Sequence, residues 1–119
     1  MSAPRRTVIL GYARTPFGKL SGSLASLTAA QLGGHAIAAA LERSGVAPTD
    51  VEHVIMGHVI QAGAGQITAR QAAMNAGLGE TVTAETINKV CASSLRAVSL
   101  ADLLIRSGQH RVIVAGGME

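Results

Sequence analysis

Aromatic residues and cysteine are almost absent from this chain of 119 residues. It has one tyrosine, one phenylalanine, no tryptophan and a single cysteine. Nucleic-acid-binding proteins stack bases on aromatic side chains and gather basic ones, whereas the basic residues here are scattered and the net charge is only +3. One cysteine forms no disulfide within the chain and provides no zinc-site spacing. We therefore expect no nucleic-acid partner, no metal and a reducing compartment, the cytoplasm.

Long apolar runs are lacking as well. No stretch approaches the 18 apolar residues that indicate a membrane-spanning helix, so we expect no membrane association. Two arginines precede the apolar run of residues 7–13, as in a signal peptide, but the run is short and Arg14 follows it, which favours a strand. Charged residues make up 14% of the chain, against about 25% in average proteins. A small domain with so few charges is expected to place much of its surface against other protein.

The remaining pattern predicts strands that alternate with helices. Thr28 and Gln31 have the form of a capping box, and Gly45 followed by Pro48 ends the first helix. The expected strands are residues 7–13, 51–60, 82–90 and 111–115, and the expected helices are residues 28–44, 66–76 and 92–106. This order, βαβαβαβ, predicts one α/β domain with a mostly parallel sheet and right-handed crossovers.

Cys91 falls between the strand of residues 82–90 and the helix of residues 92–106. A thiol there faces the first unpaired N–H groups of the helix and the positive end of its dipole, and both favour the thiolate. The carboxyl ends of parallel strands are also where α/β proteins bind ligands. A free cysteine is nevertheless more often a buried small apolar residue. Position alone therefore leaves both interpretations open.

The segment TINKVCAS, residues 86–93, resembles the nucleophile segment of the thiolases, in particular of the acetyl-CoA acetyltransferases. Other stretches resemble this family in the same order along the chain. They are residues 13–19, 54–57, 61–63, 69–73 and 114–119, so the resemblance extends from about residue 7 to residue 119.

The resemblance implies a thiolase-like layered fold, in which residues 1–119 form the N-terminal domain, truncated at its fourth strand. It implies acyl transfer through an acyl-Cys91 intermediate, either condensing two acetyl-CoA molecules or cleaving a 3-ketoacyl-CoA with coenzyme A. Coenzyme A thioesters are then substrates, and no cofactor is permanently bound. A homodimer or a dimer of dimers is expected, with residues 82–89 pairing with their copy.

In the family, the activating histidine and a second catalytic cysteine lie in the other half of the protein. Of the four histidines present, His58 is the one expected nearest the ligand end of the sheet. His35 is expected to be a half-buried packing residue, His53 to stand at a strand entrance and His110 in a turn. Because none is assigned as the base, we expect residues 1–119 alone to be inactive. We also expect them to be poorly soluble, because truncation at the fourth strand leaves a sheet edge and an apolar face of the helix of residues 92–106 uncovered.

Two departures from the family pattern and three alternatives accompany this interpretation. Ser94 replaces a usual glycine and is expected to crowd the acyl pocket, and Ile67-Thr68 replaces a usual Asn-Pro, which bears on subunit contacts. A ketoacyl synthase-type condensing enzyme is one alternative, although residues 88–90 favour a thiolase. A binding or assembly domain without catalysis is the second. A dinucleotide site at residues 63–65 is the third, and it is disfavoured because Thr68 stands where a third glycine is required.

Overall fold

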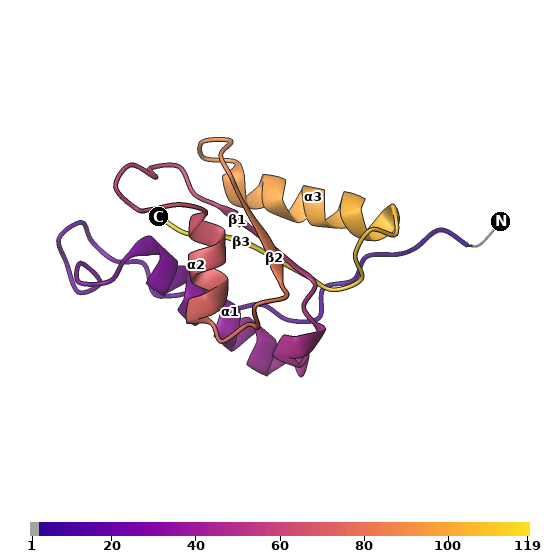
Figure 1. The fold of residues 1–119 in the computed structure, drawn as a ribbon. Coiled ribbons are helices and arrows are strands. Elements are labelled where there is room, and N and C mark those ends of the chain that lie inside the picture. The colour runs from indigo at the N-terminus through magenta and orange to yellow at the C-terminus, as the bar shows by residue number, and fades with distance from the viewer. Residues whose placement is uncertain (1–2) are drawn as a thin grey trace.

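The computed structural model describes residues 3–119, and helices and strands alternate along it (Figure 1). The elements are α1 (Ala29–Ser44), the 3₁₀-helix η1 (Pro48–Asp50), β1 (His53–Gly57), α2 (Thr68–Asn75), β2 (Thr83–Ile87), α3 (Ser93–Arg106) and β3 (Ile113–Gly117). The predicted α/β class is confirmed.

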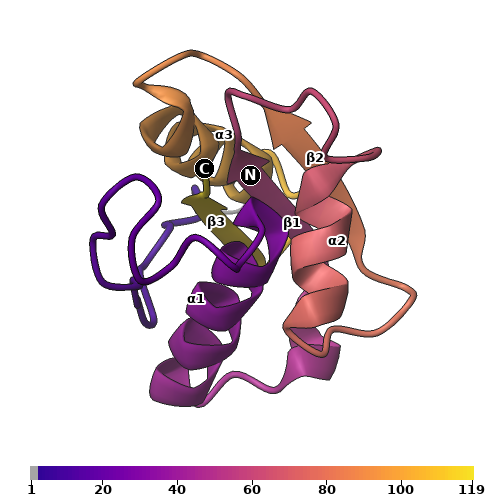
Figure 2. The ribbon, with the colours of Figure 1, turned by 90° about the vertical axis from the view of Figure 1, so that its left-hand side faces the viewer.

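The three strands form a parallel sheet in the order β2-β1-β3. Every residue of the central strand β1 is buried. Helices α1 and α2 cover one face of the sheet and α3 covers the other, which gives three layers (Figure 2). Because the strands are parallel, their carboxyl ends at Gly57, Ile87 and Gly117 share one edge of the sheet.

Alternating side chains of β1 build two cores. Val54 and Met56 belong to the cluster that α1 and α2 cover, together with Ile37. Ile55 points the other way, to Ala97 and Ala101 of α3. A strand buried on both faces has few polar positions, and this explains the continuous apolar sequence VIM at residues 54–56.

The ends of α1 lie where the sequence predicts them. The Thr28 hydroxyl oxygen accepts from the Gln31 N–H at 3.1 Å, and the Gln31 side chain accepts from the Thr28 N–H at 2.9 Å. Gly45 ends the helix with φ at 71°. Within α1, Gly33 and Gly34 allow close packing. A Cβ on Gly34 would lie 2.6 Å from the Cβ of Asn75, the last residue of α2.

The strand predicted at residues 7–13 is wrong, and the sheet within residues 3–119 therefore has three strands rather than four. These residues line a groove of about 350 Å³ together with residues of α1, α3 and β3. No ladder of hydrogen bonds joins them to β3, which pairs with β1 alone among residues 3–119. Several apolar side chains of this segment are exposed, with Ile9 at 81% and Tyr12 at 80%.

Helix α3, which is apolar over most of its surface, is buried on one side only. Only Ser93, Ala97 and Ala101 of this helix are buried, while Leu95 is 73% exposed. The cause is that one face of the sheet covers one face of the helix, and no other element described here packs over the rest. Within residues 3–119, no helix combines the length and the apolar character needed to cross a membrane.

Candidate active site

Cys91 is exposed at the carboxyl edge of the sheet, in the turn formed by residues 88–92. The sequence places it directly after a strand ending at Val90, whereas β2 already ends at Ile87 and α3 begins at Ser93. The alternative of a buried cysteine is wrong. An exposed thiol at the edge where α/β proteins bind ligands is accessible to a substrate.

Backbone hydrogen bonds fold this turn tightly around Cys91. The N–H of Ala92 donates to the carbonyl oxygen of Lys89 at 3.0 Å, and the N–H of Ser93 donates to that of Val90 at 3.1 Å. On the amino side, the Val90 N–H donates to the Asn88 Oδ1 at 2.9 Å. Cys91 is therefore central to two overlapping turns.

Val90, the residue before the cysteine, has a left-handed backbone with φ at 47°. A β-branched side chain makes this conformation unfavourable, at a cost of about 1–3 kcal/mol. Burial does not compensate for this cost, because Val90 is 64% exposed. Strained residues of this kind gather at functional sites, where the surrounding structure holds them in place.

Two glycines at the ends of strands let the start of α3 approach the sheet. A Cβ on Gly57, at the end of β1, would lie 2.6 Å from the Cβ of Ser93 and 2.7 Å from its carbonyl carbon. At the end of β3, a Cβ on Gly117 would lie 3.0 Å from the Cβ of Ser94 and would overlap its hydroxyl oxygen. Ser94 is exposed and its hydroxyl is directed at this glycine. The serine thus occupies space over the end of β3.

No hydrogen bond or ion pair joins a histidine to Cys91 in the part of the chain that is described. His58 is 2% exposed and lies on the α2 side of the sheet, where its Nδ1 is 2.8 Å from the Thr68 hydroxyl. Its Nε2 is 3.8 Å from the carboxylate of Glu119. His35 is exposed, so its expected packing role is wrong. Residues 3–119 also contain no group of three side chains that could hold a metal ion.

His53 and His110 lie at the opposite, amino edge of the sheet, as predicted for a strand entrance and a turn. Their rings stack with centroids 4.9 Å apart. Beside them, Glu52 accepts from the Arg111 backbone N–H at 2.7 Å and from its Nε at 3.1 Å. These hydrogen bonds lower the pKa of Glu52 from its usual 4.5. This cluster joins β1 to β3 and is remote from the cysteine edge.

The loop before α2 contains a second strained residue, Ile67, with φ at 41°. The next residue, Thr68, is buried and hydrogen-bonds His58. Thr68 also lies 3.3 Å, oxygen to oxygen, from the hydroxyl of Thr86 in β2. The two residues that depart from the family pattern therefore differ: Ile67 strains the loop and Thr68 ties it to the sheet.

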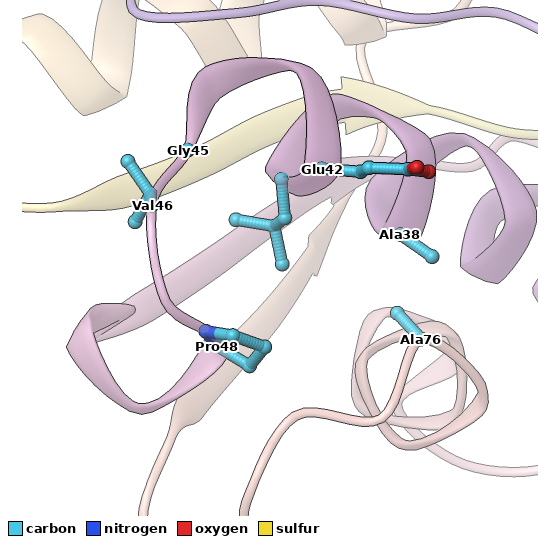
Figure 3. Close-up of a pocket in the computed structure, with 7 residues that line it drawn as sticks. Ala38, Glu42, Gly45, Val46, Pro48 and Ala76 are labelled. Atoms are coloured by element: carbon cyan, nitrogen blue, oxygen red, sulfur yellow. The ribbon is translucent and has the colours of Figure 1, made fainter.

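A hollow of about 320 Å³ lies at the carboxyl end of α1 (Figure 3). Its walls come from α1, from residues 45–48 and from Ala76 after α2, and Glu42 is the ionisable residue among them. Cys91 does not line it. The hollow therefore contributes nothing to the cysteine site.

The domain has the three layers and the parallel sheet of the α/β class, whose members bind ligands at the carboxyl edge of the sheet, and its exposed cysteine lies at that edge. The family model described as thiolase, N-terminal domain, matches residues 7–119, and the chain belongs to the thiolase family. The resemblance noted in the sequence is confirmed.

Among curated proteins, the chain is 57% identical over 113 residues to a probable acetyl-CoA acetyltransferase of Mycobacterium leprae. It is 52% identical over 116 residues to acetyl-CoA acetyltransferase 2 of Arabidopsis thaliana, and 50% identical over 115 residues to the acetyl-CoA acetyltransferase of Escherichia coli. These alignments cover 95%, 98% and 97% of this chain and 29% of each relative. The chain thus spans less than a third of the length of these relatives.

Proposed function

We propose that these residues are the nucleophile-bearing part of a longer acetyl-CoA C-acetyltransferase, in which Cys91 forms the acyl-enzyme. The observation that supports this most directly is the exposed Cys91 in its strained turn at the carboxyl edge of the sheet, in a chain of the thiolase family. The names of the relatives favour acetyl-CoA over an acyl-carrier protein as donor, and so favour a thiolase over a ketoacyl synthase.

In the proposed reaction, the Cys91 thiolate attacks the carbonyl carbon of acetyl-CoA. The bond from that carbon to the coenzyme A sulfur breaks, and coenzyme A leaves as a thiolate that takes up a proton. A base then removes a proton from the methyl carbon of a second acetyl-CoA. This carbon attacks the acetyl-cysteine, which releases acetoacetyl-CoA and regenerates the Cys91 thiolate. In the reverse direction, coenzyme A cleaves a 3-ketoacyl-CoA.

The turn itself offers one group for this chemistry besides the thiol. Within residues 3–119 no acceptor is found for the backbone N–H of Cys91, so this N–H is available to a developing oxyanion. The base comes from outside residues 1–119 in this proposal, and no permanently bound cofactor is required. An exposed thiol that must stay reduced suits the cytoplasm, where we place the enzyme.

The test uses the native polypeptide that carries this sequence. Acetyl-CoA should transfer its acetyl group to Cys91, which peptide mass spectrometry detects, and the protein should cleave acetoacetyl-CoA when coenzyme A is added. The variant Cys91→Ser should lose almost all turnover, because a serine hydroxyl is a far weaker nucleophile without a strong base. Amide exchange should show an unchanged fold. Turnover by Cys91→Ser at the wild-type rate would contradict the proposal.

One observation favours the second candidate, a binding or assembly domain without catalysis: no base reaches Cys91 within the described residues. The two candidates differ in their prediction for the native polypeptide, since the assembly domain leaves Cys91 unacetylated. Residues 1–119 alone should be inactive in either case. They should also self-associate, because Leu95, Leu103 and Phe17 are among the exposed apolar side chains.

We also propose that the enzyme is a homodimer or a dimer of such dimers, with β2 at the subunit interface. Within residues 3–119, β2 pairs with β1 alone and its other edge is free. An unpaired edge accepts a further strand readily, and a second copy of residues 82–89 would complete it. Sedimentation of the native polypeptide at micromolar concentration should show a dimer or tetramer, and a monomer would contradict this proposal.

A further inference from the structure

Ser93, the first residue of α3, holds the turn of Cys91 with a single hydroxyl group. Its side chain is buried, with 4% of the residue exposed. The Oγ accepts from the backbone N–H of Lys89 at 2.8 Å and donates to the carbonyl oxygen of Val90 at 2.6 Å. The hydroxyl therefore joins the two residues before Cys91 to the residue that starts the helix.

The two hydrogen bonds of the Ser93 hydroxyl are important because burial does little to hold the turn in place. Cys91 and Val90 are both exposed, so burial contributes little to fixing the position of the thiol. Val90 is also in a left-handed conformation that its side chain disfavours. Its carbonyl oxygen accepts from both the N–H and the hydroxyl of Ser93. The hydrogen bonds to Ser93 are thus a main restraint on the peptide that leads into Cys91.

Ser93 is in turn packed against the buried sheet. A Cβ on Gly57 would lie 2.6 Å from the Cβ of Ser93, so the serine lies directly against the end of the buried central strand. A functional group is positioned best when the residues that hold it are themselves fixed by packing. Ser93 connects the exposed turn to the sheet in this way.

We propose that Ser93 is a positioning residue for acyl transfer by Cys91. Its hydroxyl keeps the turn in the conformation in which the sulfur of Cys91 meets the acyl carbon while the N–H of the same residue meets the acyl oxygen. Ser93 does not touch the reacting atoms in this proposal. The inference rests on the proposed function, because it assigns the serine a role in the same acyl-transfer step.

The test compares Ser93→Ala with Ser99→Ala in the native polypeptide. Ser99 is a matched control because it lies in the same helix, is exposed, and hydrogen-bonds the Arg96 carbonyl oxygen at 3.0 Å away from the turn. Thiolysis of acetoacetyl-CoA gives kcat and KM. The kcat is expressed per molecule whose Cys91 can be acetylated by acetyl-CoA, so that unfolded protein is not counted. Amide exchange of Lys89 reports the hydrogen bond to Ser93 directly.

Ser93→Ala should lower kcat about 10- to 100-fold, the usual effect of losing a group that orients a reactive residue. The KM should stay within about twofold, because substrate binding is not altered. The Lys89 amide should exchange faster, and Ser99→Ala should behave as wild type in every measurement. A general loss of structure would instead reduce the amount of acetylatable Cys91 and leave kcat per site unchanged.

An equal kcat per site for the two variants would overturn the inference. If Ser93→Ala does not fold, hydrogen exchange of the Lys89 amide in the wild-type protein provides the test. An amide that exchanges as fast as one in a free peptide would show that the Ser93 hydroxyl does not hold it, and would overturn the inference. Failure of the proposed function has a different signature, in which wild-type Cys91 is not acetylated at all. Even then, amide exchange of Lys89 tests the hydrogen bond between its N–H and the Ser93 hydroxyl.

Discussion

Replacing Gly57 by alanine should displace the start of α3 and, with it, the turn of Cys91. The added Cβ would lie 2.6 Å from the Cβ of Ser93, 2.7 Å from its carbonyl carbon and 2.8 Å from the Ser94 nitrogen. Carbon atoms in contact are about 3.5–4.0 Å apart, so the helix must retreat by about 1 Å. Two of the three atoms belong to the backbone, so a change of rotamer cannot relieve the clash.

The expected consequences are a loss of stability and a larger loss of turnover. Overpacking of a buried site costs about 1–3 kcal/mol. A reactive group displaced by about 1 Å loses about 100-fold in rate. The matched control is Gly79→Ala, because an added Cβ there meets no atom within 4 Å. Urea unfolding and acetoacetyl-CoA thiolysis should be measured on both variants of the native polypeptide. Equal stability and equal activity of the two would refute the packing argument.

Two further substitutions test other features of the structure. Ile67→Asn should stabilise the protein by about 1 kcal/mol in urea unfolding, because asparagine tolerates the left-handed conformation with φ at 41°, and a lower midpoint would contradict this. Glu52→Gln should lower the melting temperature at neutral pH, because the folded-state pKa of Glu52 lies below 4.5 and its ionised form is the one that Arg111 stabilises. That stabilisation is present above pH 4.5 and is lost as the pH falls through the folded-state pKa. The difference in melting temperature between the wild type and Glu52→Gln should therefore shrink in acid. A difference that stays the same would show that the Glu52 charge does not cause it.

The parts of the fold that depend on local chemistry could be predicted from the sequence. The capping residues Thr28 and Gln31 and the terminal Gly45 fix the ends of α1 through contacts within the helix itself. The strand predicted at residues 7–13 shows the opposite case. Its composition suits a strand, but a strand exists only when a partner supplies hydrogen bonds, and that partner cannot be read from the segment itself.

The position of the candidate site could be predicted from the sequence, but the backbone conformation and the hydrogen bonds that hold it could not. The change of pattern before and after Cys91, together with the resemblance, located the cysteine between a strand and a helix. The left-handed backbone of Val90 was not predictable, because a β-branched residue is an unusual choice for it. The two hydrogen bonds of the Ser93 hydroxyl were not predictable either, because both partners are backbone groups that become neighbours only when the turn is folded.

The order of the strands in the sheet has a consequence for how the domain assembles during synthesis. The central strand β1 comes first in the chain, and its two neighbours, β2 and β3, are made later, each after an intervening helix. At about 5–20 residues per second, several seconds separate the synthesis of β1 from that of β3. During this time Val54, Ile55 and Met56, which are buried in the finished sheet, have no strand on one side. Pairing between such distant segments is slow, so the nascent chain is exposed to aggregation through this strand before residues 113–117 have emerged.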